Sequence, residues 1–494
     1  MPAPLLAFFP LPFDNVRIRR EMMEIGDRPH LVRAAWDVWL ASRGDPLSLA
    51  QRKRVRVDSL IAFAKARSPF YRKRYGHLSS PVPDLPSLPP VTKQELMENF
   101  DEWVTDPAVT RYGVERFASD RNLIGTPYLG RYIVFATSGT TGRPAVFVHD
   151  RGAASVYLAL GLVRRFLPLM SPGTLWAFLR GGLRTAAIVA TGGHFTSSVI
   201  EGLARRRFPR LSGGSRTLSL LAPLPDLVRE LNGFRPAILG SYPTAMAVLA
   251  GEQEAGRLRI APVLALTGAE WLSAASRERI SSAFRCPVRD TYAASEFMGI
   301  AFDCDRGRLH LNADWLVLEP VDEEYRPVPP GRASYTTLLT NLANRVQPIL
   351  RYDLGDSVTE IPGRCPCGNP LPTIQVEGRR DEILIFRSSL GETIPLLPMA
   401  LATVVEETPG ISSYQLVQTG PAHLRIRLDE APGHDRTRVG NVIADRLREF
   451  LSAQGLKAVV VEMTEERPTR DPAGGKLRQI FSALPSGGYD PADP

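Results

Sequence analysis

Short apolar runs alternate with segments of helical character between residues 131 and 380. The runs are often β-branched, and examples are Ala186–Ala190, Ala237–Leu239, Val263–Leu266 and Val288–Tyr292. Strands that alternate with helices in this way are typical of an α/β fold with a largely parallel sheet. We therefore expect residues 131–380 to form the core of a large α/β domain with mixed, mainly parallel sheets.

The residues before this core are predicted to be mostly helical. Apolar residues recur at helical spacing in Arg52–Arg67, and Thr92 with Glu95 three residues later predicts a helix start with a capping box. We expect residues 1–130 to form the helical N-terminal part of the large domain.

The residues after the core are predicted to form a separate α+β unit, 382–494, of a size that can fold around its own core. Its predicted strands cover 383–387, 414–418, 424–428 and 458–463, and its predicted helices cover 399–407 and 436–453.

Charge and hydropathy exclude several classes of partner. The net charge is +8, from 54 Arg and 6 Lys among the basic residues, which are scattered apart from runs at 52–56 and 204–210. These runs are predicted to be solvated helix faces, so we expect no nucleic-acid partner.

No unbroken apolar stretch reaches the roughly 18 residues that span a bilayer, and Met1–Phe13 lacks the features of a signal peptide. We expect no membrane association and a cytoplasmic location, and four cysteines do not suggest a disulfide framework.

A loop rich in hydroxyl groups and glycine lies between the strand-like runs 131–136 and 145–149. It contains Thr137, Ser138, Gly139, Thr140, Thr141 and Gly142, followed by Arg143 and Pro144. Such a loop offers backbone N–H and hydroxyl donors to a polyphosphate. It is not a Walker loop, because no Gly-Lys-Ser/Thr follows. The pattern indicates a phosphate-binding hairpin loop, and a surface turn of the same composition is the alternative.

Five more motifs follow this octet in a fixed order. They are Gly268–Trp271, Tyr292–Glu296, Arg351–Asp356, Gly378–Asp381 and Gly474–Arg478. The series resembles the acyl-adenylate-forming (ANL) superfamily, which includes acyl-CoA ligases, adenylation domains and luciferases. Leu88–Lys93 and Ser295–Gly299 point to its phenylacetate–CoA ligase-like branch. The resemblance implies a large N-terminal adenylate-forming domain followed by a small mobile C-terminal lid domain.

The resemblance also implies roles at the phosphate end of a nucleotide. The octet, residues 137–144, would hold the β- and γ-phosphates of ATP. Glu296 would hold Mg²⁺, a hard cation that takes one or two carboxylates beside substrate phosphates. Ser295 would contact the α-phosphate, and Lys476 would bridge the α-phosphate and the attacking carboxylate. The alternative for Glu296 is an ordinary acid at a helix N-terminus.

At the nucleoside end, the resemblance implies an adenine and ribose site. Gly268, Ala269 and Glu270 would lie against the adenine, Tyr292 would stack on it, and Asp356 with Arg379 would bind the ribose. The alternatives are a core role for Tyr292, a turn role for Asp356 and a surface ion pair for Arg379 with Asp381. Two alanines, 293 and 294, stand where the family has a glycine, which would loosen the backbone contact with the nucleotide.

A second group of residues has the composition of a zinc site. Cys304, His310, Cys365 and Cys367 offer three thiolates and one imidazole, a tetrahedral zinc set. The alternative is three reduced cysteines in unconnected loops. The fourth cysteine, Cys286, is predicted to be a small buried hydrophobe.

The acceptor of the acyl group stays open at the level of sequence. The branch implies coenzyme A and an aryl or arylacetic acid, with Trp176–Arg184 and His194 among the residues expected near the acid. Relatives of the same motif set transfer the acyl group to an amine or a carrier protein, and a non-catalytic nucleotide-binding protein is the remaining alternative. The sequence leaves a homodimer open.

Overall fold

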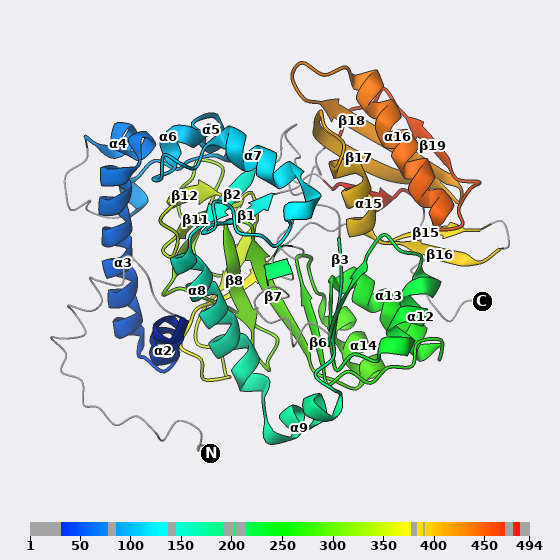
Figure 1. Ribbon diagram of the computed structural model, residues 1–494, viewed down its shortest axis with the longest axis horizontal. Coiled ribbons are helices and arrows are strands. Elements are labelled where there is room, and N and C mark those ends of the chain that lie inside the picture. The colour runs from blue at the N-terminus through cyan, green and yellow to red at the C-terminus, as the bar shows by residue number, and fades with distance from the viewer. Residues whose placement is uncertain are drawn as a thin grey trace.

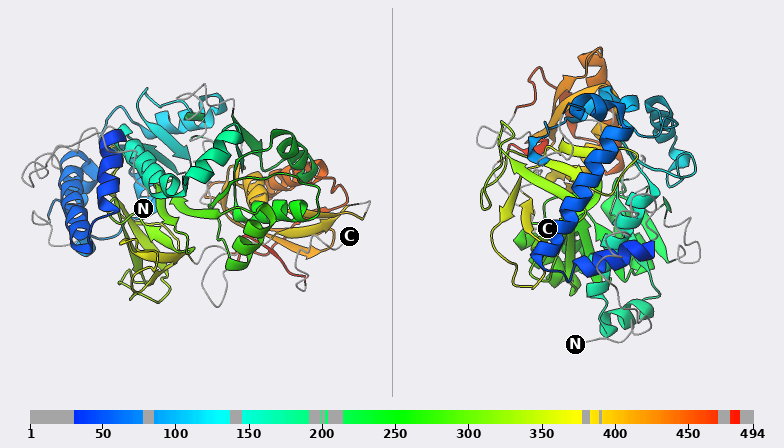
Figure 2. Two further views of the ribbon diagram at one scale, coloured as in Figure 1. Left: turned by 90° about the horizontal axis from the view of Figure 1, so that it is seen from below. Right: turned by 90° about the vertical axis from the view of Figure 1, so that its left-hand side faces the viewer.

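The computed structural model describes residues 31–77, 85–136, 145–190, 199, 202–203, 214–376, 383–388, 391–469 and 478–484. In these ranges it forms two regions (Figure 1). The N-terminal helices and the central sheets make a large body, and the strands and helices after residue 383 make a smaller one. Figure 2 shows that the N-terminal helices and the C-terminal strands lie at opposite ends of the molecule.

The N-terminal part is helical, as the sequence predicts. Its elements are α2 (Leu31–Ala41), α3 (Pro46–Arg67), α4 (Pro69–Tyr75), η1 (Leu85–Ser87), α5 (Lys93–Glu98), α6 (Phe100–Trp103), α7 (Arg111–Ser119) and η2 (Arg121–Leu123). Helix α3 starts where the Asp45 carboxylate accepts the backbone N–H groups of Leu47 and Ser48. Thr92 caps α5 by accepting the Glu95 N–H at 3.2 Å, so the predicted helix start is confirmed.

A nine-stranded mixed sheet runs through the large body in the order β13-β14-β9-β8-β7-β6-β5-β3-β4. The parallel half comprises β3 (Thr185–Val189), β4 (Ser215–Ser219), β5 (Ile238–Ser241), β6 (Leu264–Gly268) and β7 (Val288–Ala294). The antiparallel half adds β8 (Phe297–Asp303), β9 (Leu309–Leu311), β13 (Val358–Ile361) and β14 (Thr373–Val376). Every run that the sequence predicts to be a strand is one. Within this nine-stranded sheet, parallel pairing is confined to β3–β7.

Helices and smaller sheets complete the large body. The helices are α8 (Arg151–Leu160), the π-helix η3 (Gly161–Phe166), η4 (Leu167–Leu169), α9 (Pro172–Arg180), α12 (Leu224–Phe234), α13 (Pro243–Glu254) and α14 (Ala274–Phe284). β1 (Ile133–Ala136) and β2 (Val146–His149) pair antiparallel, which confirms the predicted hairpin. β10 (Leu316–Val321), β11 (Thr336–Asn341) and β12 (Ile349–Asp353) form a three-stranded antiparallel sheet.

The smaller body has the predicted α+β composition. Its elements are β15 (Leu384–Arg387), β16 (Thr393–Leu396), α15 (Pro398–Glu406), β17 (Ile411–Gly420), β18 (His423–Glu430), α16 (Arg436–Ala453), β19 (Val460–Met463) and β20 (Ile480–Ser482). Its main sheet has the order β19-β18-β17-β20. Its buried apolar residues belong to the same hydrophobic cluster as the buried residues of the segment from β3 to α14 in the large body. A hydrogen bond also joins the two bodies, because Gln454 Nε2 donates to Leu221 O at 2.8 Å.

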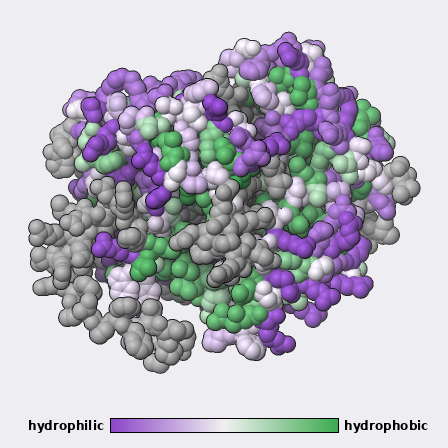
Figure 3. Space-filling model, viewed as in Figure 1, coloured by the Kyte–Doolittle hydropathy of each residue, from purple (hydrophilic) through white to green (hydrophobic). Residues whose placement is uncertain are grey.

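One surface region is apolar. Figure 3 shows hydrophobic residues gathered where α8 and α9 lie, and Leu158, Leu175, Trp176 and Leu179 are exposed there. Trp176, expected near an acyl pocket, is 63% exposed on this surface.

The helical stretch Arg151–Leu169 is the one described segment long and apolar enough to cross a membrane by length and composition. The sequence prediction counted only unbroken apolar residues and so passed over it. A third of the segment is buried, and core helices of soluble proteins pass the same test, so one such segment is weak evidence of a span.

Candidate active site

The β7–β8 turn carries two of the predicted catalytic residues. Ala294 pairs with Phe297, so Ser295 and Glu296 form the tight turn between them. Glu296 is 6% exposed, and its carboxylate accepts a hydrogen bond from Tyr352 on β12. Burial raises the pKa of Glu296, and the Tyr352 hydrogen bond and the nearby Lys93 ammonium oppose this rise. Mg²⁺ is bound in proteins by one or two carboxylates together with substrate phosphates, and Glu296 offers one such carboxylate.

The two residues predicted to bind the nucleoside meet beside this turn. The Tyr292 hydroxyl donates to Asp356 Oδ2 at 2.6 Å. Burial, followed by the negative charge of Asp356, raises the pKa of Tyr292 well above its usual value. Asp356 follows β12, and Gly355 before it has a φ of +77°, which turns the chain toward Tyr292. The structure thus brings together residues 64 positions apart in the sequence.

The predicted adenine loop lies at the end of the neighbouring parallel strand. β6 ends at Gly268, opposite Thr291 of β7. Ala269 has a φ of +68°, an uncommon conformation for a residue with a Cβ. The Glu270 carboxylate accepts the Thr244 N–H at 3.0 Å and its hydroxyl at 2.7 Å. Glu270 therefore anchors this loop to the start of α13, at the carboxyl end of the sheet where α/β folds bind ligands.

Lys93 belongs to this site, although the sequence did not predict it to. The sequence placed Lys93 only at the start of a helix and in the motif Leu88–Lys93. Val91 pairs with β12: its N–H donates to Arg351 O at 3.0 Å, and Asp353 N–H donates to Val91 O at 2.9 Å. The buried Arg351 also bonds the carbonyl of Leu88. These contacts place the start of α5 beside Glu296, whose pKa the Lys93 charge lowers. The available signal was that Lys93 is one of only six lysines in an Arg-rich chain.

Three predicted groups lie outside the described residues. They are the octet with Thr137, Ser138, Gly139, Thr140, Thr141 and Gly142, the ribose residue Arg379 with Asp381, and the lysine loop with Lys476. His194 is also outside them. The flanks of the octet are described, and they lie side by side because Ala136 pairs with Val146.

The four predicted zinc ligands converge. The ligand atoms of Cys304, His310, Cys365 and Cys367 all lie within 4.8 Å of one another. The two sulfurs of Cys304 and Cys365 are 3.8 Å apart, and His310 Nε2 is 3.3 Å from Cys367 Sγ. His310 is fully buried, and its Nδ1 lies 3.1 Å from Leu371 O. A hydrogen bond from Nδ1–H leaves the Nε2 lone pair for a metal, so these residues fit a zinc ion.

Cys286 lies apart from this group, as predicted. It is buried, and burial raises the pKa of its thiol to about 11, which makes it an unreactive packing residue.

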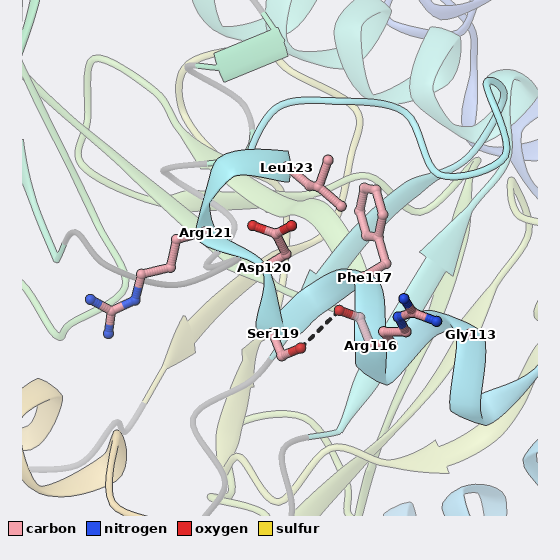
Figure 4. Close-up of a pocket in the computed structure, with 7 residues that line it drawn as sticks. All are labelled: Gly113, Arg116, Phe117, Ser119, Asp120, Arg121 and Leu123. Atoms are coloured by element: carbon pink, nitrogen blue, oxygen red, sulfur yellow. Dashed lines mark hydrogen bonds between the residues drawn. The ribbon is translucent and has the colours of Figure 1, made fainter.

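A surface pocket lies elsewhere, between α7 and η2 (Figure 4). It has a volume of about 650 Å³, and its wall includes Arg116, Phe117, Asp120 and Arg121. Asp120 accepts the Asn122 N–H and so caps η2, and the Ser119 hydroxyl donates to Arg116 O. None of the predicted site residues within the described ranges lines this pocket.

Comparisons with known proteins define the fold. No protein-family model matches the chain. The chain is 23% identical over 351 residues to Protein CapK of Staphylococcus aureus. The matched region covers 67% of this chain and 68% of that protein. It is similar in structure to 2-hydroxyisobutyryl-CoA ligase in complex with 2-HIB-AMP and CoA in the thioesterification state. That match has a TM-score of 0.54 and 19% identity, and covers 90% of this chain and 91% of the other.

A second structure of that ligase, in the postadenylation state in complex with R3-HIB-AMP, gives a TM-score of 0.51 at 18% identity over 90% and 91% of the two chains. The chain therefore has the fold of this ligase, and the fold that the six motifs imply is confirmed.

Proposed function

We propose that this protein activates a carboxylic acid with ATP to an acyl-adenylate and then transfers the acyl group to coenzyme A. The observation that carries this proposal is the meeting of Glu296, Tyr292, Asp356 and Lys93 at the carboxyl ends of β6 and β7. These residues come from three separate parts of the chain: the start of α5, the β7–β8 turn with the end of β7, and the segment after β12. Their types match a nucleotide with its phosphates at Glu296 and its ribose at Asp356.

The chemistry follows from charge. The substrate carboxylate attacks the α-phosphate, and the bond to pyrophosphate breaks. Catalysis of such a transfer is mainly alignment of the reactants and neutralisation of phosphate charge. Mg²⁺ would supply part of that neutralisation when bound, and Glu296 is the carboxylate that would hold it. Lys93 would contribute a second positive charge, and Lys476, from the C-terminal motif, a third.

The acid and the acceptor are the finer part of the proposal. The solved relative named above is a CoA ligase captured with an adenylate and CoA, which supports coenzyme A as acceptor. The motif resemblance to the phenylacetate–CoA ligase-like branch supports an aryl or arylacetic acid. An amine or a carrier protein as acceptor is the second candidate, because the same adenylating residues would serve it.

Pyrophosphate exchange tests the activity. With ATP, Mg²⁺ and a panel of aryl, arylacetic and hydroxy acids, the protein should exchange labelled pyrophosphate into ATP, and should form an acyl-CoA when CoA is added. Absence of exchange with every acid would contradict the enzymatic proposal and favour a nucleotide-binding protein. Exchange without thioester, but with amide formed from an added amine, would favour the second candidate.

We also propose that Cys304, His310, Cys365 and Cys367 hold one structural zinc ion. The donor set is complete, so no ligand position is left for a substrate, which is typical of structural zinc. The site would tie the β8–β9 turn to the loop before β14, two segments of the antiparallel half of the sheet.

A further inference from the structure

A closed set of buried hydrogen bonds holds the Ser295–Glu296 turn from behind. His149 Nε2 lies 2.8 Å from Ser295 O, and His149 Nδ1 lies 3.0 Å from the Tyr157 hydroxyl. Asn341 Nδ2 lies 2.8 Å from the same hydroxyl and 2.8 Å from Glu296 O. His149, Tyr157 and Asn341 therefore link the carbonyls of two consecutive residues of the turn. We call these three residues the turn clamp.

The two carbonyl oxygens and the Asn341 amide determine which atom donates in each hydrogen bond of the clamp. A carbonyl oxygen only accepts, so His149 Nε2 carries a hydrogen and donates to Ser295 O. Nδ1 of this neutral tautomer accepts, so the Tyr157 hydroxyl donates to it and accepts from Asn341. The Asn341 Oδ1 accepts the N–H groups of Ala343 and Asn344, which fixes the amide with its NH₂ toward Tyr157 and Glu296.

The clamp is buried. His149 is 1% exposed, Asn341 is fully buried and Tyr157 is 5% exposed. Aromatic rings close it on two sides: Phe135 lies 5.2 Å from the His149 ring and Phe297 lies 4.9 Å from the Tyr157 ring, centre to centre. Water cannot replace a lost partner in such a place, so removal of one member leaves buried polar groups unpaired.

The positions of the members give the clamp a functional meaning. His149 ends β2, the strand that leaves the octet, while Tyr157 lies on α8 and Asn341 ends β11. The clamp therefore joins the strand behind the phosphate loop to the turn that carries Ser295 and Glu296. The Ser295 carbonyl lies in the peptide before Glu296 and the Glu296 carbonyl in the peptide after it. Holding both carbonyls fixes the peptide planes on either side of the Glu296 Cα, and with them the direction of the Glu296 side chain.

We propose that His149, Tyr157 and Asn341 are positioning residues for adenylation, which hold the metal- and α-phosphate-binding turn in register with the phosphate loop. This inference rests on the proposed function. It assigns the three residues no contact with substrate, so their effect should appear in turnover and metal dependence rather than in recognition of the acid.

Matched variants test the proposal. His149→Phe keeps an aromatic ring, slightly larger than imidazole, and removes both hydrogen bonds, while His149→Gln can still donate to Ser295 O. Asn344→Ala is the control, because Asn344 is equally buried and bonds Val148 O on the same strand without reaching the turn. Tyr157→Phe is a milder clamp variant, to be used if His149→Phe fails to fold.

The expected outcome separates positioning from general stability. His149→Phe should lower kcat for pyrophosphate exchange by roughly 10- to 100-fold, the scale of a small misalignment of reacting groups. It should also raise the Mg²⁺ concentration for half-maximal rate, with little change in KM for the acid. His149→Gln should restore part of the rate. Asn344→Ala, corrected for the folded fraction, should stay close to wild type even if its melting temperature falls as far.

Hydrogen exchange provides a readout that does not need activity. Backbone amides of residues 291–300 should exchange faster in His149→Phe and Tyr157→Phe than in wild type and Asn344→Ala. An inactive wild-type protein would contradict the proposed function. An active wild type in which the clamp variants match Asn344→Ala, in rate and in amide exchange, would overturn the clamp.

Discussion

Burial sets the charge of the side chains at the centre of this site. Burial lowers the pKa of His149 to about 4, so the imidazole is neutral near pH 7, as its two hydrogen bonds require. The same physical cause acts in the opposite direction on acids, and it raises the pKa of Glu296 and Tyr292. At residue scale the site therefore holds one buried carboxylate whose charge depends on nearby cations, Lys93 among them.

The buried histidine predicts an acid-sensitive stability. A histidine with a folded pKa near 4 and an ordinary unfolded pKa of 6.5 binds fewer protons when folded. The free energy of unfolding should therefore be highest above pH 6.5 and fall as the pH decreases from 6.5 to 4. The contribution of His149 to the free energy of unfolding would reach about 3 kcal/mol above pH 6.5. Urea unfolding of wild type and His149→Gln at pH 7.5 and pH 4.5 measures it, and the variant should lose less stability than wild type. Equal losses would contradict the assignment.

At the scale of elements, a buried ion network joins helices to sheet. Arg164 of η3 makes two parallel bonds to Asp314, at 2.7 and 2.9 Å, and both side chains are almost fully buried. Arg56 of α3 donates to Asp314 O at 2.6 Å and pairs with Asp37 of α2 at 2.6 Å. The network thus locks α2, α3 and the π-helical segment η3 onto the loop before β10. Although burial opposes ionisation, the two arginines hold the pKa of Asp314 below its usual value.

Removing one partner of this network should be costly. Asp314→Asn leaves the Arg164 guanidinium buried without its counter-charge, and such breaks typically cost about 3–5 kcal/mol. Denaturant unfolding should show this loss. The control is Asp58→Asn, which breaks the exposed pair with Arg54 at 3.7 Å and should cost under about 1 kcal/mol. Similar losses in the two variants would refute the role given to the buried network.

The cysteine–histidine group is a second link between elements, and it gives a metal prediction. Purified protein should contain about one zinc ion per chain. Cys365→Ser should lose the ion and lower the melting temperature, because structural zinc contributes directly to folding free energy. Cys286→Ser is the matched control: it removes a buried thiol outside the group and should keep the zinc. Zinc-free wild-type protein with an unchanged melting temperature in Cys365→Ser would rule the site out.

At the scale of the whole molecule, the smaller C-terminal body shares a hydrophobic cluster with the large one, and few polar contacts join the two among the described residues. Besides the Gln454–Leu221 bond, Arg121 beside η2 lies 3.4 Å from Glu407 after α15, on an exposed surface. The solved relative exists in a postadenylation and a thioesterification state. Resemblance to the superfamily leads us to expect that rotation near Asp381 would bring Lys476 to the α-phosphate and then withdraw it.

Two variants separate the two half-reactions. Lys476→Ala should lower adenylation by roughly two orders of magnitude, the scale of a lost electrostatic stabiliser. It should affect thioester formation from a supplied acyl-adenylate much less. Asp381→Pro, which fixes φ at the expected hinge, should adenylate but transfer slowly. Single-turnover measurements of each half-reaction give the comparison. If both variants slow the two steps equally, the two-state mechanism does not apply.

Much of the candidate site could be found in the sequence because its motifs are local. Glycine, hydroxyl and carboxylate residues at fixed short spacing mark the octet, Tyr292–Glu296 and Arg351–Asp356. Lys93 was passed over as a site residue because its partner Glu296 is about 200 positions away, and only the pairing of Val91 with β12 brings the two together.

The sequence by itself determined many of the helices and strands and the order of the chemical motifs. Helix α16 covers the predicted residues 436–453, and the runs before 292 became strands, because periodicity and capping act over a few residues. Only the tertiary structure decided that the sheet changes from parallel to antiparallel at β7, that Tyr292 meets Asp356, and that His149, Tyr157 and Asn341 close on one turn. These contacts join residues far apart in the chain. Side-chain packing and the hydrogen bonding of buried polar groups determine these contacts, and no local sequence pattern predicts them.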